Sequence, residues 1–192
     1  MHRTHIVDGR VEGVVLKEIF SNRGVGTMIY ADRLDDIRPM TPSDIPAVLG
    51  IMEPLAEAGV LVKRTAAELG GRLDEFAVYE VDGTIHACGG LHLFPDRTGE
   101  ICGVAVDDSY ENMGTGRRMV AWLMNRAAQA KCRKVFLLTT RASDWFYSIG
   151  FKKGTLKDLP KEKRAGYDVR RNSLILVCAL PGRRLHGGLR ME

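Results

Sequence analysis

Residues 99–120 read GEICGVAVDDSYENMGTGRRMV, which predicts a short apolar strand, a polar turn with two closely spaced glycines, and the start of an amphipathic helix. The first backbone N–H groups of such a helix have no partner within the helix. The helix dipole adds partial positive charge at the same end. This stretch therefore predicts a binding site for an anionic ligand, such as one that carries a phosphate.

The composition is that of an ordinary globular protein. The chain has 192 residues, 45% of them hydrophobic and 27% charged, and this length is enough for one domain with a substantial core. The net charge of +4 is a mild excess and does not indicate nucleic-acid binding. No apolar run approaches the roughly 18 residues of a membrane span, and the N-terminus lacks the apolar region of a signal peptide. We expect neither a nucleic-acid partner nor a membrane.

The four cysteines, Cys88, Cys102, Cys132 and Cys178, lie far apart in the sequence and form no Cys-x-x-Cys pair. This spacing indicates reduced thiols in a cytoplasmic protein rather than a metal site. The histidines are scattered as well, and we interpret His92 as a surface or packing residue.

Hydrophobic periodicity predicts the following elements. Near the N-terminus we expect a strand end at 4–7, a helix over 11–20, a strand over 25–29 and a polar linker over 32–36. The main domain then follows in chain order as a strand at 37–40, a helix to residue 59, a short helix over 65–73, a hairpin of strands 76–81 and 84–94, a strand over 101–106, a helix ending near 131, a strand over 135–140, a short helix over 143–149, a charged loop or short helix over 156–167, and a last strand over 174–180.

This order of elements resembles that of the GNAT acyltransferase superfamily. The superfamily signature, Gln/Arg-x-x-Gly-x-Gly/Ala, is similar to ENMGTG at 111–116, and WFYSIGF at 145–151 resembles the closing helix. The resemblance implies the GNAT fold, an α/β (α+β) architecture with a mixed, mostly antiparallel central sheet flanked by helices. It also implies that the backbone amides of the turn hold the pyrophosphate of acetyl-CoA. The cofactor-binding residues expected on this basis are Val104, Val106, Met113, Gly114, Thr115, Gly116 and Arg117.

Within that superfamily, residues 37–180 resemble the acetyltransferase domain of the bacterial N-acetylglutamate synthase family. The similar segments are GVLVKR at 59–64, GEIC at 99–102, LTTR at 138–141 and RNS at 171–173. Residues 5–30 resemble the end of the amino-acid-kinase-like domain that precedes it in that family. We therefore expect a remnant of that domain plus a linker over 1–32, the acetyltransferase domain over 33–180, and a disordered tail over 181–192.

The family resemblance implies transfer of the acetyl group of acetyl-CoA to the α-amine of L-glutamate, the first step of arginine biosynthesis, without a metal. Only a neutral amine attacks a thioester, so a general base is useful, and Glu100 at the start of a buried strand is the candidate. The resemblance gives the matching glutamate this role. It places the general acid at Thr139, and Tyr147 or water remain alternatives.

The acceptor site can be argued from charge. Free glutamate carries two carboxylates, so its pocket needs at least two cationic groups, preferably arginines for bidentate binding. Arg64 and Arg171 match the substrate arginines of the resembled family. Ser173 matches a further hydroxyl contact, and Lys63 is adjacent to Arg64.

One residue departs from the superfamily signature. Glu111 stands at the first signature position, where a carboxylate repels phosphate and weakens cofactor binding unless Arg117 or Arg118 offsets it.

A GNAT enzyme acting on another amino acid, a small amine or a protein N-terminus is one alternative function. A non-catalytic acyl-CoA-binding or regulatory domain is another. The sequence leaves open whether the chain forms a homo-oligomer and whether arginine regulates it.

Overall fold

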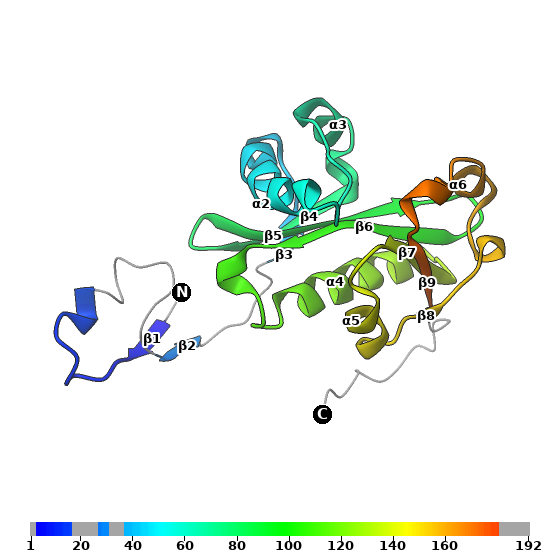
Figure 1. Cartoon of the computed structure of the whole chain (residues 1–192). Helices are drawn as coiled ribbons and strands as arrows, with labels where there is room; N and C mark the ends of the chain where they lie inside the picture. The colour runs from blue at the N-terminus through cyan, green and yellow to red at the C-terminus, as the bar shows by residue number, and fades with distance from the viewer. Residues whose placement is uncertain (1–2, 17–26, 31–36, 181–192) are drawn as a thin grey trace. The chain divides into compact units, whose positions relative to one another are not determined.

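The computed structural model describes residues 3–16, 27–30 and 37–180 (Figure 1). Contacts divide the chain into two units, residues 1–36 and 37–192. In the first unit, β1 (Arg3–Ile6) pairs antiparallel with β2 (Thr27–Tyr30), which confirms the two expected strands. Residues 17–20 of the helix expected over 11–20 and the whole tail from 181 lie outside the described residues. Within the described ranges, no helix has the length and apolar character needed to cross a bilayer.

The second unit is built on a seven-stranded sheet with the order β3-β4-β5-β6-β7-β9-β8. Every neighbouring pair is antiparallel except β6 and β7, which run parallel. This confirms the expected mixed, mostly antiparallel sheet. The strands are β3 (Ile37–Pro39), β4 (Phe76–Val81), β5 (Thr84–Leu93), β6 (Thr98–Val106), β7 (Lys134–Thr139), β8 (Lys152–Lys153) and β9 (Leu174–Ala179).

Helices cover both faces of this sheet, with α2 and α3 on one side and α4 and α5 on the other (Figure 1). The α-helices are α2 (Ile45–Glu57), α3 (Ala66–Gly70), α4 (Thr115–Gln129), α5 (Ser143–Ser148) and α6 (Lys161–Ala165). Single 3-10 turns are η1 (Pro42–Asp44), η2 (Leu73–Glu75), η3 (Asp108–Tyr110), η4 (Leu156–Asp158) and η5 (Val169–Arg171). The expected helices are present, although α3 ends at Gly70 rather than at residue 73.

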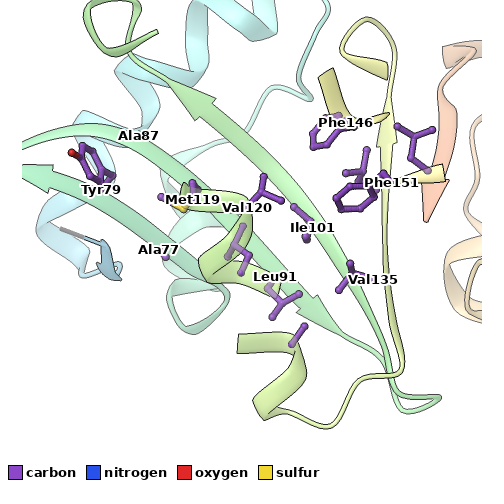
Figure 2. Close-up of a cluster of buried hydrophobic side chains, with 14 of the residues drawn as sticks. Ala77, Tyr79, Ala87, Leu91, Ile101, Met119, Val120, Val135, Phe146 and Phe151 are labelled. Atoms are coloured by element: carbon purple, nitrogen blue, oxygen red, sulfur yellow. The ribbon is translucent and has the colours of Figure 1, made fainter. Parts of the chain in front are cut away.

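The alternation of side chains along β4 explains the two cores. Phe76 and Val78 belong to the cluster on the α2 side, whereas Ala77 and Tyr79 belong to the cluster on the α4 side. Because both faces are covered, the strand is an almost continuous apolar run. Figure 2 shows the α4 side, where Met119 and Val120 of α4 pack among the strands.

The expected β4–β5 hairpin is confirmed. Asp82 and Gly83 both have positive φ, at 54° and 78°, as a two-residue turn of the type favoured in hairpins requires. Farther along, the β5–β6 register shifts between Cys88 and Gly90, so that Gly89 faces a bulge of two β6 residues, Gly103 and Val104, and Gly103 has φ of +60°. A Cβ at Gly103 would also lie 3.1 Å from the Phe76 ring, so glycine suits the position on both counts.

The two parallel strands pair over a short length only. β6 pairs with β7 from Thr98, opposite Lys134, to Glu100, opposite Phe136. Beyond Glu100, β6 continues to Val106 beside β5, while β7 continues to Thr139 beside β9. Among the described residues, the β7-facing edge of β6 therefore has no strand partner after Glu100. The sheet opens at this point.

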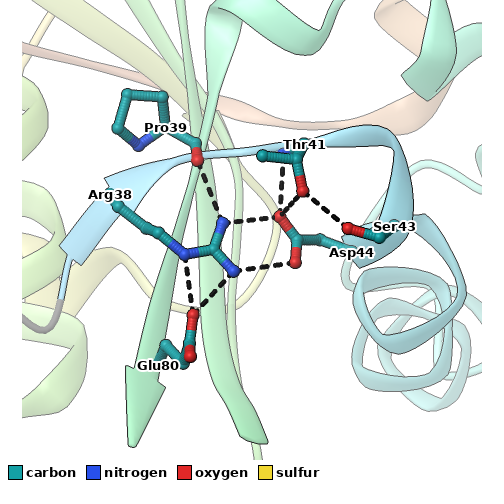
Figure 3. Close-up of polar contacts among 6 residues, drawn as sticks. All are labelled: Arg38, Pro39, Thr41, Ser43, Asp44 and Glu80. Carbon is teal, nitrogen blue, oxygen red and sulfur yellow. Dashed lines mark hydrogen bonds and ion pairs between the residues drawn. The ribbon is translucent and has the colours of Figure 1, made fainter. Parts of the chain in front are cut away.

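An ion-pair network fixes the start of the domain (Figure 3). The Arg38 guanidinium donates to both oxygens of Asp44, at 2.7 and 2.9 Å, and its Nε donates to Glu80 Oε2 at 2.7 Å. The Thr41 N–H and hydroxyl also donate to Asp44 Oδ2, at 2.7 and 2.8 Å. Arg38 of β3 thus joins Asp44, in the turn before α2, to Glu80 of β4. The sequence predicted a helix after the strand at 37–40 but not the link from Asp44 to Arg38.

Candidate active site

A cavity of about 310 Å³ lies beside the point where β6 and β7 separate. Its lining residues come from the loop before α3, the turn after it, β5, β6 and α6. They are Arg64, Arg72, His92, Phe94, Glu100, Cys102, Glu162 and Lys163. Glu100 and Cys102 alternate along β6 with Ile101, which packs in the α4-side core. The cavity therefore lies on the opposite, α2–α3 side of the sheet.

Glu100 is the buried carboxylate of this cavity, with 8% of the residue exposed. It pairs with His92 across β5–β6 and with Phe136 across β6–β7, so strands on both sides fix its backbone. Lys163 of α6 contacts it through Nζ, 2.6 Å from Glu100 Oε1. The strand placement of Glu100 agrees with the sequence prediction, but the contact with Lys163 was not predicted.

Arg64 is the cation of the cavity that makes no ion pair with any described residue. Its guanidinium lies over the Phe76 ring, 5.4 Å from the centroid, which orients it without neutralising it. A carboxylate entering the cavity would find this charge unpaired. The structure thus brings together Glu100 and Arg64, the predicted base and one predicted substrate arginine.

The other cavity arginine, Arg72, is held by Glu75. Its Nε donates to Glu75 Oε2 at 2.9 Å, and His92 Nδ1 lies 2.9 Å from Glu75 Oε1. Burial raises the pKa of Glu75, but the hydrogen bonds from Arg72 and His92 lower it more, so its net pKa falls below the ordinary value. His92, which the sequence analysis interpreted as a surface or packing residue, instead lines the cavity and joins this chain of contacts.

The glycine-rich turn lies at the N-terminus of α4. Gly114 has φ of 76°, in the left-handed region, and its carbonyl accepts the Arg118 N–H at 3.0 Å. A Cβ at Gly116 would lie 3.3 Å from Trp145 of α5 and 3.6 Å from Val106 of β6, so the turn is packed against both sides of the sheet opening.

Other members of the predicted cofactor set surround this turn. The Thr115 hydroxyl is buried and has no hydrogen-bond partner among the described residues. Met113 and Arg117 are exposed, and Val104 is half-buried on the unpaired edge of β6. Glu111 is exposed at the start of the turn.

The remaining predicted residues are not among those that line the cavity. Thr139 ends β7, is 7% exposed, and its Oγ1 accepts the Ala142 N–H at 3.1 Å. Leu174, the residue after Ser173, pairs with Thr139, so Ser173 lies at the same end of the sheet. Arg171 and Lys63 are both exposed, and Tyr147 of α5 is 39% exposed.

A hydrogen bond from the Thr140 hydroxyl to the Gly59 carbonyl, at 3.5 Å, links the end of β7 with the loop that carries Lys63 and Arg64. This contact is long for a hydrogen bond. It nevertheless shows that the loop after α2 and the end of β7 meet across the sheet opening. No group of three or more His, Cys, Asp or Glu side chains suited to a metal occurs in the described ranges.

The sequence analysis missed Arg72, Glu75, His92 and Lys163. The hairpin and the following strand were predicted, but their mutual register was not, because the 95–97 connection and the bulge near Gly103 both shift it. Only the register places His92 opposite Glu100. Lys163 reaches the cavity from a short helix of five residues, which periodicity cannot distinguish from a charged loop.

The chain belongs to the acetyltransferase (GNAT) family, whose model matches residues 53–151. This match includes the cavity residues from Arg64 to Cys102, the unpaired edge of β6 and the glycine turn, but not α6, and it confirms the superfamily resemblance.

Among curated proteins, the chain is similar to the amino-acid acetyltransferase of Pasteurella multocida (strain Pm70), with 36% identity over 183 residues. That match covers 95% of this chain and 42% of the relative, so the chain spans less than half the length of the curated protein.

Among solved structures, it is similar to N-acetylglutamate synthase from Neisseria gonorrhoeae complexed with coenzyme A and N-acetyl-glutamate, with 33% identity and a TM-score of 0.75 over 94% of this chain and 43% of that one. The same enzyme complexed with coenzyme A and L-arginine gives 32% identity and a TM-score of 0.79 over 93% of this chain and 41% of that one.

Proposed function

We propose that this chain binds acetyl-CoA and transfers its acetyl group to the α-amine of L-glutamate. The observation that carries this proposal is the pairing, in one cavity, of a buried carboxylate, Glu100, with a guanidinium, Arg64, that lacks an ion-pair partner among the described residues. A carboxylate suits an ammonium group and a free guanidinium suits a carboxylate. An amino acid presents both groups, and glutamate adds a second carboxylate.

The binding site proposed for acetyl-CoA is the opening between β6 and β7 together with the turn before α4. Free N–H groups at the α4 N-terminus suit the phosphates, and the unpaired edge of β6 from Ile101 to Val106 suits an extended arm that carries amide groups. In this proposal the cofactor runs from the turn on the α4 side, along the unpaired edge of β6, to the cavity on the α2–α3 side. The thioester and the amine can thus meet at Glu100.

In the proposed reaction, Glu100 accepts a proton from the ammonium of the bound amino acid, and the neutral nitrogen attacks the thioester carbonyl carbon. The new C–N bond replaces the C–S bond, the thiolate of coenzyme A leaves, and the second proton lost by the nitrogen balances the proton that the thiolate takes up. Thr139 is the proposed acid: its Oγ1 accepts from Ala142, and a hydroxyl engaged as an acceptor keeps its own proton to donate. Tyr147 is the alternative donor.

The protonation of Cys102, the thiol that lines the cavity, favours direct transfer over an acyl-enzyme intermediate. Burial, aided by the Glu100 carboxylate, raises the pKa of Cys102 to about 11. The thiolate is the nucleophilic form of cysteine, so Cys102 remains a neutral and unreactive thiol near neutral pH. His92, the neighbouring base, is engaged with Glu75.

We further propose that Arg171 and Ser173, beside the end of β7, contact the second carboxylate, with Lys63 adjacent to Arg64. This proposal is supported by the pairing of Leu174 with Thr139 and by the contact between Thr140 and Gly59. We also infer a cytoplasmic location and a role in arginine biosynthesis. The four free cysteines fit a reducing compartment.

The test follows release of coenzyme A from acetyl-CoA with a panel of amino acids and amines, together with the mass of the product. Acetylated glutamate should form, and Glu100→Gln should lower kcat roughly 100-fold or more while the protein still binds acetyl-CoA. Turnover of an unrelated amine with none of glutamate would refute the assignment. Absence of acetyl-CoA binding at millimolar concentration would support a non-catalytic domain.

A further inference from the structure

The ion pair between Lys163 and Glu100 places a primary amine on the proposed catalytic base. Lys163 lies in the middle of α6, and its side chain is 31% exposed, while that of Glu100 is 10% exposed. The lysine thus reaches from the surface into the cavity and ends 2.6 Å from the carboxylate oxygen.

The neighbouring lysines of this region have other surroundings. Lys157 and Lys161 line a separate cavity of about 350 Å³, and Lys134, which lines it too, has Nζ 3.6 Å from Asp158 Oδ1. Glu162 lines both cavities, so α6 forms the wall between them. Among the described lysines, Lys163 alone forms an ion pair with Glu100.

The position of the Lys163 amine suggests that it can itself react, and this inference rests on the proposed function of Glu100 as the base. If Glu100 removes a proton from the acceptor amine, any other amine held at Glu100 occupies the position of that acceptor. A lysine side chain and an amino acid both present an ammonium that becomes a nucleophile once it loses a proton.

We propose that Lys163 is an internal acetyl acceptor, which is acetylated from a bound acyl-CoA thioester when no amino acid occupies the cavity. Glu100 accepts the proton from Lys163 Nζ, and the neutral nitrogen attacks the thioester carbonyl carbon. A C–N amide bond forms, the C–S bond breaks, and the thiolate of coenzyme A leaves and takes up a proton. The product is a neutral acetyl-lysine that no longer pairs with Glu100 and that fills the acceptor cavity.

This modification has two consequences. The acetylated chain loses activity toward an amino acid because the cavity is filled, so incubation with acetyl-CoA alone inactivates the enzyme with time. A bound amino acid displaces Lys163 from Glu100 and therefore protects. At an amino-acid concentration about ten times its Kd, the unoccupied fraction, and with it the rate of modification, falls roughly tenfold.

The test incubates the purified chain with acetyl-CoA, with and without glutamate, and follows the intact mass, the acetylated peptide and the remaining activity. A single acetyl adduct should form at Lys163 at the rate of inactivation. Lys163→Arg keeps a cation beside Glu100 but cannot be acetylated at this position, so it should abolish both adduct and inactivation. The matched control, Lys161→Arg on the same helix, should retain both. Glu100→Gln should remove the adduct, which separates catalysed transfer from chemical acetylation.

The outcomes distinguish this inference from the proposed function. Glutamate turnover without a Lys163 adduct would overturn the inference and leave the proposed function standing. An adduct that depends on Glu100, with no glutamate turnover, would uphold the inference and refute glutamate as the acceptor. Adducts spread evenly over Lys157, Lys161 and Lys163 would overturn the inference, and the absence of both turnover and adduct would overturn both proposals.

Discussion

The Arg64 guanidinium lies 5.4 Å from the centroid of the Phe76 ring, on the side of the sheet that carries Glu100. Phe76 is fully buried at the start of β4, so the ring is a fixed platform. It orients a charge that makes no ion pair with any described residue. A stacked, unpaired guanidinium at the wall of a cavity is well placed to bind a carboxylate.

Removing this charge should weaken binding of the acceptor. Arg64→Gln is expected to raise the KM for glutamate about ten- to hundredfold, because a hydrogen bond to a charged group contributes roughly 1.5–3 kcal/mol. The kcat should change less, since Glu100 remains in place. Steady-state kinetics with saturating acetyl-CoA provide the measurement. The neighbouring Lys63→Gln, whose side chain is exposed and outside the cavity lining, should have a smaller effect, and equal effects at both positions would contradict this placement.

The charge at the first signature position gives a second prediction. Glu111 is exposed at the glycine turn, so Glu111→Gln should tighten acetyl-CoA binding about two- to fivefold, in line with roughly 0.2–1 kcal/mol for exposed charge pairs. Titration calorimetry at low salt measures this, and the gain should shrink as salt is added. Asp108→Asn, in η3 before the turn, is the control. An unchanged Kd for Glu111→Gln would mean that its carboxylate faces away from the phosphates.

The network around Arg38 predicts an effect on stability. Asp44 is 6% exposed and Arg38 contacts both its oxygens, so Asp44→Asn should lower the free energy of unfolding by about 1–3 kcal/mol. Glu80→Gln, at the more exposed side of Arg38, should lower it by about 0–1 kcal/mol. Urea unfolding measures both. Equal losses would contradict the view that the buried Asp44 contributes more to stability than the more exposed Glu80.

The ion pair between Arg38 and Asp44 makes the stability of the fold depend on pH. The hydrogen bonds from Arg38 outweigh burial and hold the pKa of Asp44 well below its usual value. A carboxylate with a depressed pKa stabilises the fold above its ordinary pKa, and that contribution is lost as the pH falls through the lower, folded-state value. The stability difference between the wild type and Asp44→Asn should therefore stay constant from pH 8 to about pH 5 and shrink only in stronger acid.

His86 should destabilise the fold in mild acid. It is 5% exposed, stacks on Tyr110 with ring centroids 3.8 Å apart, and its Nδ1 has no hydrogen-bond partner among the described residues. Burial lowers its pKa, although the charges of Asp107 and Asp82 oppose this. The unfolded chain thus binds a proton more readily, so stability falls as the pH drops below about 6.5. His86→Phe keeps the stacking and should flatten this decline, whereas an unchanged slope would assign it to other groups.

The parts of the fold that sequence predicts best are those fixed by local chemistry. The Asp82-Gly83 turn and the apolar stripe of Met119, Val120 and Leu123 each depend on near neighbours in the chain. Where the structure differs from the sequence prediction, long-range packing is the cause. β6 begins at Thr98 rather than at 101, since Gly99 fits where a Cβ would lie 2.9 Å from Leu91, and the two-residue β8 is held only by β9.

The residues of the candidate site also divide into those that the sequence predicts and those that long-range packing brings together. Glu100 and Arg64 could be predicted because a buried strand carboxylate and the charge demand of glutamate, read with a family resemblance, point to them. The Arg72–Glu75–His92 contacts could not, since they join three segments whose distances depend on the register of β5 against β6. Lys163 is likewise brought to Glu100 by the packing of a five-residue helix.

A comparison of glutamate with glutamine as acceptors tests whether the cavity selects an amino acid with an acidic side chain. These substrates differ only in the replacement of the side-chain carboxylate by an amide. The measurement is kcat/KM for each, at saturating acetyl-CoA. We predict that glutamate is preferred by about tenfold to several-hundredfold, as the loss of one charge-assisted contact implies. A ratio near one, or a preference for glutamine, would show that the cavity does not select an acidic side chain.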